Sequence, residues 1–444
     1  MDTYRSAYRN YGSRVALDGA PRPRRRPDRA EHGWGCPATG PATCNFITHS
    51  QAPAIVSDSR EKLYLVSCAA MSVFGMVLAL PGTVLGLPEV VGRFDLTLAD
   101  RGVLIATLFI GLLAGSVASG PVVDAVGHRV SLAVSAALIA AGLPLFSAAS
   151  SYPLALISLA AIGVASAGIN TAANALCSET FPHELGRRMN GIAIAVGTGG
   201  LSMPAATALL GGTVSWSGVV NGGAVLAAAV TIAALRLAAP RASTIEVSAA
   251  ARIPAVLRQP GLIWFALLVM CAAGTEASMA GFTSTYLTTL GFTPRAATWA
   301  LSSHWVGLIA GRLALARLVD RGKRRAILAA ALAGAAALLV LATTATMGVL
   351  AIAPFAVGLA IAIVMPTTLA LAGERYREHA GTLFGILLTL AQAGAIVLPA
   401  AVGVVGEYSG VRAGMSILVV NNLLVAAICL KAAGRTRAAG TRRR

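Results

Sequence analysis

The sequence predicts an all-α membrane protein with twelve transmembrane helices in two pseudo-symmetric six-helix bundles. Hydrophobic residues make up 56% of the chain and charged residues only 12%, whereas about a quarter of the residues in soluble domains are charged. Continuous apolar runs recur, each close to the roughly 20 residues that a helix needs to cross a bilayer. A pattern of glycines and charges also recurs in the second half of the chain.

Twelve apolar runs can be placed as membrane-spanning helices. A membrane barrel would show short segments of alternating polarity, but these runs are unbroken stretches of Ala, Leu, Val and Ile. An N-terminal bundle over residues 60–238 is expected to contain helices at 63–86, 103–121, 130–149, 152–176, 189–211 and 217–238. A C-terminal bundle over residues 260–432 is expected to contain helices at 260–289, 297–316, 326–346, 347–372, 381–405 and 411–431.

Three segments outside the bundles are expected to be cytoplasmic. Residues 1–59 are rich in Arg and Pro and predict a disordered basic tail, with a start codon assigned too far upstream as the alternative. They do not resemble a secretory signal, because no apolar segment follows the arginines until Leu63. Residues 239–259 predict a linker, and residues 433–444 predict a second basic tail.

The positive charges indicate the orientation of the chain in the membrane. The formal net charge is +17, with 35 Lys and Arg. With the N-terminus in the cytoplasm, they all fall on cytoplasmic segments except Arg93, Arg101, Arg295, Arg312 and Arg412. This follows the positive-inside rule, so we expect both termini in the cytoplasm of a cell-membrane protein. Anionic lipid headgroups are then the expected partner of the basic surface, and nucleic acid is not.

The internal repeat holds its spacing over several landmarks. Gly111, Gly115 and Asp124 match Gly307, Gly311 and Asp320 at one constant offset. Further matches, at an offset one residue shorter, pair Glu179, Gly186 and Pro204 with Glu374, Gly381 and Pro399. Repeated helical bundles with a site between them are typical of secondary transporters.

The stretch from Gly120 to Arg129, with Asp124 and Gly127, resembles the signature loop between helices 2 and 3 of the major facilitator superfamily. The stretch that begins at Asp320 resembles the second copy, between helices 8 and 9. This resemblance covers residues 62–432 and implies the fold and the transport activity of that superfamily.

We interpret these residues as a cytoplasmic gate. The repeated glycines are expected to let helices of opposite halves approach closely. The aspartates are expected to accept hydrogen bonds from a facing helix N-terminus or arginine. We expect Arg312 to pair at the same gate, and the alternative is that it extends toward the interface. An ordinary basic loop is the alternative for the motif itself.

A narrower resemblance is to the fucose permease branch, whose members are sugar/proton symporters. It rests on the segments from Gly168 to Asn174 and from Gly274 to Glu276, and on Phe282, Tyr286, His304 and Trp305. That branch has an acidic residue where Asn170 stands and an aspartate in helix 1, but residues 63–86 contain no carboxylate. Proton coupling at those two positions is therefore not expected.

Glu276 is the only carboxylate well inside a predicted span. Ionisable groups at membrane depth are costly and are functional candidates by default. We expect it to couple transport to protons and to contact substrate. The alternative is a protonated Glu276 that only joins helices.

Asn170 and Asn174 lie four residues apart and therefore on one face of a helix. We expect them to bind substrate hydroxyls, and interhelical hydrogen bonding is the alternative. Aromatic rings stack on sugar faces. The predicted substrate-binding residues are Asn170, Asn174, Glu276, Phe282, Tyr286 and Gln392. Trp305 is expected to belong to an interfacial aromatic belt or to serve packing, and Asn421 and Asn422 are expected to be structural.

The predicted function is secondary active transport of a sugar or similar polar solute, coupled to protons at Glu276, by a monomer. Efflux of lipophilic molecules is one alternative, and a polytopic membrane protein without transport activity is another. The sequence contains no phosphate loop and no His-Glu-x-x-His motif, so we do not expect an enzyme. The six cysteines lack metal-ligand spacing, so neither a metal nor a cofactor is expected.

Overall fold

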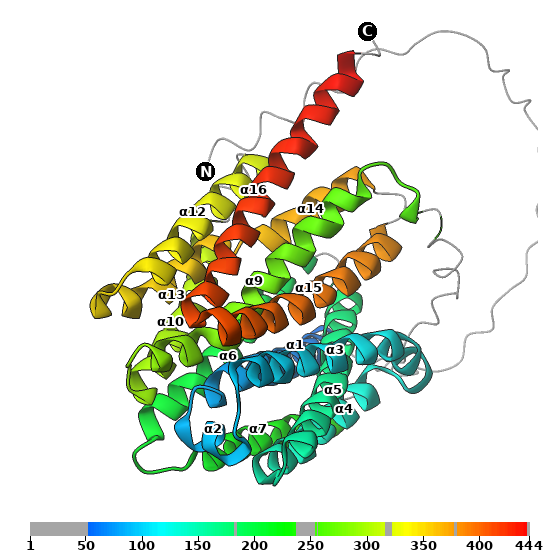
Figure 1. Cartoon of the computed structure of the whole chain (residues 1–444). Coiled ribbons are helices and arrows are strands. Elements are labelled where there is room, and N and C mark those ends of the chain that lie inside the picture. Colours follow the sequence, from blue (N-terminus) through cyan, green and yellow to red (C-terminus); the bar gives the residue numbers. More distant parts are fainter. Residues whose placement is uncertain are drawn as a thin grey trace, which may run out of the picture. The chain divides into compact units, whose positions relative to one another are not determined.

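The computed structural model describes residues 52–181, 184–236, 254, 256–315, 322–376 and 380–441 (Figure 1). Every regular element in these ranges is a helix. The first helix set comprises α1 (Ala52–Val84), α2 (Pro88–Phe94), α3 (Leu98–Val126), α4 (His128–Ala148), α5 (Tyr152–Thr180), α6 (Leu185–Leu210) and α7 (Trp216–Arg236). The second helix set comprises α9 (Leu262–Thr289), α10 (Pro294–Ala314), α12 (Lys323–Thr343), α13 (Met347–Ile361), α14 (Val364–Arg375), α15 (Ala380–Ser409) and α16 (Val411–Thr441).

Eleven helices in the described part are long and apolar enough to cross a membrane, with α13 and α14 counted as one span from Met347 to Arg375. The helix α10 has 21 residues but is not among the eleven. It carries Ser302, Ser303, His304 and Arg312, which lower its mean hydropathy. The sequence therefore predicted helices in the right places, and α10 is more polar than its neighbours.

Some expected boundaries differ from the structure. The helix α1 begins at Ala52, before the apolar run that starts at residue 63, and α16 continues to Thr441. Residues 1–51 of the expected tail, most of the expected linker and Asp320 of the expected gate lie outside the described residues.

The expected tenth span is broken into α13 and α14. The break at residues 362–363 comes before Pro366, which lacks the N–H that would bond to the carbonyl of Ala362. Both Ile363 and Pro366 line the cavity described below. Irregular backbone at membrane depth is tolerated where it borders such a cavity.

The two helix sets repeat the same packing pairs. In the first set α3 packs on α5, α1 on α6 and α4 on α7; in the second set α10 packs on α13, α9 on α15 and α12 on α16. The repeated glycines make the same close approaches in both sets. A Cβ at Gly115 would lie 2.5 Å from the Val164 carbonyl oxygen, and a Cβ at Gly311 would lie 2.5 Å from that of Leu359.

This geometry corrects the expectation that the repeated glycines join opposite halves. Gly111 lies against the Ala160 carbonyl of α5, and Gly307 lies against the Phe355 carbonyl of α13, so each packs within its own set. A helix can approach a neighbouring backbone this closely only where the side chain is absent. A Cβ at Gly120, in contrast, would meet no atom within 4 Å.

We expect Gly111→Val to destabilise the protein, because its side chain would overlap the Ala160 carbonyl oxygen. Overpacking of this kind costs about 1–3 kcal/mol. Thermal unfolding in detergent should show a lower midpoint for Gly111→Val and an unchanged midpoint for the control Gly120→Val. Equal midpoints in both variants would contradict the assigned packing.

The two sets meet through α3 and α15, α6 and α10, and α1 and α9. One end of this interface is closed, and we call it the closed end; it is formed by residues 82–102, 280–285 and 399–407. A Cβ at Gly86 would lie 2.7 Å from the Ser284 side chain, and Thr285 Oγ1 donates to the Leu85 carbonyl at 3.2 Å. The backbone N–H of Leu98 donates to Glu407 Oε2 at 2.8 Å. Close backbone contacts and a capped helix N-terminus thus join the sets at this end.

Candidate functional site: a cavity between the two helix sets

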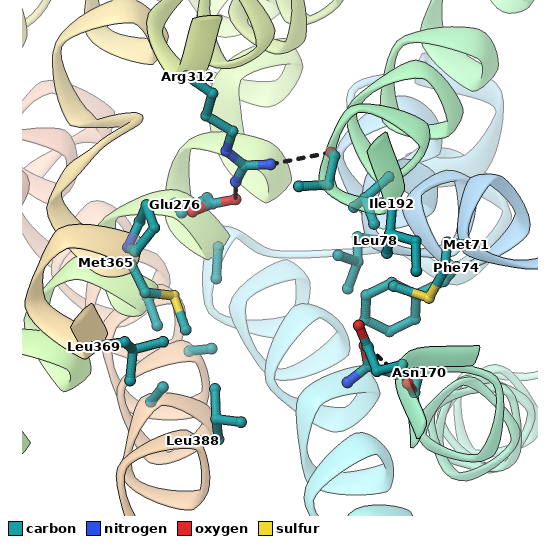
Figure 2. Close-up of a pocket in the computed structure, with 18 of the residues that line it drawn as sticks. Met71, Phe74, Leu78, Asn170, Ile192, Glu276, Arg312, Met365, Leu369 and Leu388 are labelled. Carbon is teal, nitrogen blue, oxygen red and sulfur yellow. Dashed lines mark hydrogen bonds and ion pairs between the residues drawn. The ribbon is translucent and has the colours of Figure 1, made fainter. Parts of the chain in front are cut away.

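A cavity of about 600 Å³ lies between the two helix sets (Figure 2). Its walls come from α1, α3, α5 and α6 of the first set and from α9, α10, α14 and α15 of the second. Clefts of this size hold small molecules. The closed end bounds the cavity beyond Gly82 and Ala280, where a side chain at Gly82 would overlap the Ala280 carbonyl oxygen.

An ion pair occupies the second-set wall. Arg312 Nη2 of α10 lies 3.3 Å from Glu276 Oε1 of α9, and the two side chains are 19% and 25% exposed. Arg312 Nη1 also donates to the Ala193 carbonyl of α6 at 3.3 Å. Figure 2 shows the guanidinium between these two partners. Arg312 therefore contacts both helix sets across the cavity.

The neighbouring helix α16 holds α9 in this orientation. Asn421 Nδ2 of α16 donates to the Cys271 carbonyl and to Thr275 Oγ1, both at 2.8 Å. Asn422 Nδ2 donates to the same hydroxyl at 3.1 Å. These contacts agree with the structural role expected for the two asparagines, and they position the residue that precedes Glu276.

An amide pair occupies the first-set wall, where Figure 2 shows Asn170 across the cavity from Arg312. Asn174 Nδ2 donates to Asn170 Oδ1 at 2.9 Å and to the Asn170 backbone carbonyl at 2.7 Å. Within the described part of the chain, the Asn170 amide nitrogen and the Asn174 Oδ1 have no further partner. One donor and one acceptor group on this wall therefore remain available to a ligand.

Most of the remaining lining is apolar. Large apolar side chains reach the cavity from both sets, among them Met71, Phe74, Leu78, Phe109, Leu112, Ile192, Val196, Met365, Leu369 and Leu388. Asn190, Thr367 and Gln392 add isolated polar groups. The cavity thus combines apolar walls with an ion pair on one side and amides on the other.

Four of the six predicted substrate-binding residues line the cavity: Asn170, Asn174, Glu276 and Gln392. Phe282 and Tyr286 do not. They are 1% and 0% exposed in the core, and the Tyr286 hydroxyl donates to the Leu341 carbonyl of α12 at 2.7 Å. The expected contact of these two rings with substrate therefore has no support in this geometry.

The periodicity of α9 explains this difference. Ala273, Glu276, Ala277 and Ala280 line the cavity, and their spacing of three and four residues defines one helix face. Phe282 and Tyr286 lie off that face and point into the protein instead.

The sequence-based interpretation missed other lining residues. Trp305 was expected to serve packing, and its indole does pack against Gly200, but it also lines the cavity. Arg312 was expected at the gate, but it lines the cavity and forms an ion pair with Glu276. Trp305 and Arg312 are seven residues apart, so they share one helix face. This spacing is the feature of the sequence that could have indicated that both residues face the cavity.

The expected gate loop is not engaged in this conformation. Asp124 is exposed and has no partner among the described residues, and Gly127 ends α3 with a φ of 84°. Arg129 donates to the Leu235 carbonyl. Asp320 lies outside the described residues, so its predicted role remains a prediction.

A duplicated ion pair lies beside this loop. His128 Nε2 at the start of α4 lies 3.3 Å from Glu179 Oε1 near the end of α5. In the second set, Lys323 at the start of α12 pairs with Glu374 near the end of α14. His128 and Lys323 occupy matching positions of the repeat, as do Glu179 and Glu374. The internal repeat therefore extends to side-chain contacts.

Among the described residues, no group of three or more His, Cys, Asp or Glu side chains is arranged to hold a metal ion. The polar groups of the cavity suit hydrogen bonding and ion pairing with an organic solute.

Comparisons with known proteins agree with this architecture. The sequence profile of the Major Facilitator Superfamily matches residues 63–293 and 265–443. The structure is similar to that of the nucleoside transporter NupG, with a TM-score of 0.71 and 14% identity over 84% of this chain and 99% of that chain. It is also similar to a bacterial homologue of the human lysosomal transporter Spinster, in an inward-facing and unoccupied conformation, with a TM-score of 0.67 and 14% identity over 84% of this chain and 97% of that chain. Among curated proteins, no sequence matches.

Proposed function

Because the chain belongs to the major facilitator superfamily, we propose that it is a secondary active transporter that moves a small solute across the membrane by alternating access. The observation that carries this proposal is the cavity of about 600 Å³ between two repeated helix sets, closed at one end. Transporters with internal repeats place their binding sites at such interfaces.

The proposal includes the topology. We count α10 as a membrane span in addition to the eleven apolar helices, which brings the total to twelve and makes each helix set a six-helix bundle. The positive-inside distribution supports cytoplasmic termini. The closed end then faces outward, and this conformation is open toward the cytoplasm. The unengaged Asp124 supports this assignment, because a cytoplasmic latch is not expected to form while that side is open.

The lining supports an amphipathic solute. Each buried hydroxyl left without a partner costs about 1–3 kcal/mol, and few polar groups face the cavity. A solute with an apolar body and polar groups at its ends can contact the apolar walls, the ion pair and the amides together. Glu276 is the group that we propose exchanges a proton, because it is the carboxylate that lines the cavity.

A monosaccharide is the second candidate. The amides of Asn170 and Asn174, with Gln392, can donate hydrogen bonds to vicinal hydroxyls and accept hydrogen bonds from them. A sugar is also the substrate class that the resemblance to the fucose permease branch implies. Phe282 and Tyr286 do not take part in this version. An uptake direction and an efflux direction are both compatible with the cavity.

Solute counterflow in proteoliposomes tests the proposed function. Purified protein should exchange labelled solute across the membrane, and it should do so for at least one member of a panel of sugars and amphipathic organic acids, amines and alcohols. An absence of counterflow for the whole panel, with folded protein, would contradict solute transport of these classes.

A further inference from the structure

We propose that the cavity carries an amphipathic monoanion together with one proton, with Arg312 holding the anionic group and Glu276 carrying the proton. This inference rests on the proposed transport function and specifies its substrate class. It narrows the amphipathic solute proposed above to an anion and assigns a separate role to each member of the ion pair.

The charge of the cavity is the first argument. Among the described lining residues, Glu276 and Arg312 are the two that carry charge, and they neutralise each other at 3.3 Å. The other helices that pack on α9 place no charged group there. The lining residues of α1, α3, α14 and α15 are uncharged, α13 contains no ionisable residue, and α16 meets α9 through Asn421 and Asn422.

The second argument is that only one member of the pair can give up its charge. Arginine stays protonated in proteins, whereas a carboxyl group exists in a charged and in a neutral, protonated form. If Glu276 is protonated, Arg312 is left with an unpaired positive charge that one anion neutralises. A bound cation would instead compete for Glu276 and leave Arg312 unpaired, and unpaired charges away from water are costly. Among solutes with a single charge, only an anion that binds together with a proton leaves both the empty and the loaded cavity neutral.

The third argument is the geometry of Arg312. Its contacts to Glu276 Oε1 and to the Ala193 carbonyl are both 3.3 Å long, whereas strong charge-assisted hydrogen bonds measure about 2.7–2.9 Å. The guanidinium has five donors in a planar fork that matches an acid group in two-point contact. Donors therefore remain for a carboxylate, a sulfonate or a phosphate diester, and the existing contacts are long enough to be exchanged.

The rest of the cavity selects the body of the anion. Apolar side chains cover most of the walls between the ion pair and the amide pair, among them Phe74, Leu78, Met365 and Leu369. An aromatic or aliphatic body fits this surface. Asn170 and Asn174 on the far wall can bind one polar group at its other end.

Three naphthalene probes test the charge rule on the full-length protein in phosphatidylcholine nanodiscs: the monoanion naphthalene-2-sulfonate, the cation 2-naphthylmethylammonium and the neutral alcohol 2-naphthalenemethanol. Sulfonate is used because it does not titrate near neutral pH. Calorimetry in buffers of different ionisation enthalpy should show that the sulfonate binds most tightly and that binding takes up about one proton. Where Glu276 is ionised in the empty protein, the dissociation constant of the sulfonate should rise about tenfold per pH unit.

The variants separate the two roles. Glu276→Gln should bind the sulfonate without proton uptake and without pH dependence, and the sulfonate should raise its thermal midpoint more than that of the wild type. Arg312→Gln should weaken sulfonate binding at least about tenfold, with Arg312→Lys in between. The matched controls Glu89→Gln and Arg295→Gln, both exposed, should bind like the wild type.

Three outcomes would overturn the inference: tighter binding of the cation, sulfonate binding without proton uptake, or no binding of any probe. If Arg312→Gln fails to fold, the inference is still tested by proton uptake in the wild type and by its loss in Glu276→Gln. If lysophosphatidylglycerol displaces the sulfonate at a lower concentration than a free organic acid does, the result would support the charge rule and indicate a lipid as the source of the anion. Alternating access is measured separately at Ala370, as described in the Discussion, so failure of this inference is distinguishable from failure of the proposed function.

Discussion

Replacing Gly82 with valine is expected to abolish most transport and to hold the protein open at the closed end. Gly82 of α1 packs directly on the backbone of α9, and any side chain there would overlap the Ala280 carbonyl oxygen. Overpacking costs about 1–3 kcal/mol, and a bias of that size changes the ratio of two conformations by about 5- to 150-fold. The initial rate of counterflow should fall accordingly.

The control for this variant is Gly222→Val in α7, where an added Cβ would meet no atom within 4 Å. It should transport like the wild type. Spin-label distances across the closed end should lengthen in Gly82→Val alone. Normal counterflow in Gly82→Val would show that α1 and α9 need not approach this closely during the cycle.

The second large effect is expected from Asp124→Asn. In this conformation Asp124 is exposed and has no partner in the described ranges, so the substitution should leave the thermal midpoint unchanged. We propose that the carboxylate forms its contact when the cytoplasmic side closes. Hydrogen bonds to charged groups contribute about 1.5–3 kcal/mol, so counterflow should fall at least about tenfold.

Asp95→Asn is the matched control, because Asp95 is exposed and has a φ of 50°, a conformation that Asn adopts readily. It should transport normally. Wild-type counterflow in Asp124→Asn would leave the motif with a role in topology only.

The helices and their repeat were predictable because hydropathy and glycine spacing depend on local sequence. Apolar runs located the spans, and the offset between Gly111 and Gly307 identified the duplication. The partners of those glycines were not predictable in this way. A glycine indicates that something approaches closely, but only the packing shows that Ala160 and Phe355 of the same set are the neighbours. The break before Pro366 was not predictable from the missing N–H alone either, because Pro81, Pro121 and Pro204 lie inside unbroken helices.

In the candidate site, the chemical type of a residue was a better guide from sequence than the direction in which its side chain points. Glu276 was found because a carboxylate at membrane depth is unusual, and Asn170 and Asn174 were found because they share a face. Phe282 and Tyr286 were chosen for their chemistry, but the 3.6-residue period of α9 points them away from the cavity. The pairing of Arg312 with Glu276 depends on how α10 packs beside α9, which sequence spacing does not encode.

Alternating exposure of the cavity is the central claim, and the accessibility of one cavity residue tests it most directly. Ala370 of α14 lines the cavity and is exposed in this conformation, so Ala370→Cys in a cysteine-free background reports which side the cavity faces. A membrane-impermeant thiol reagent should label it from the cytoplasmic side and, during counterflow, also from the outside. In the Gly82→Val background, labelling from the outside should dominate. Labelling from one side only, in every condition and in both backgrounds while solute is exchanged, would contradict alternating access through this cavity.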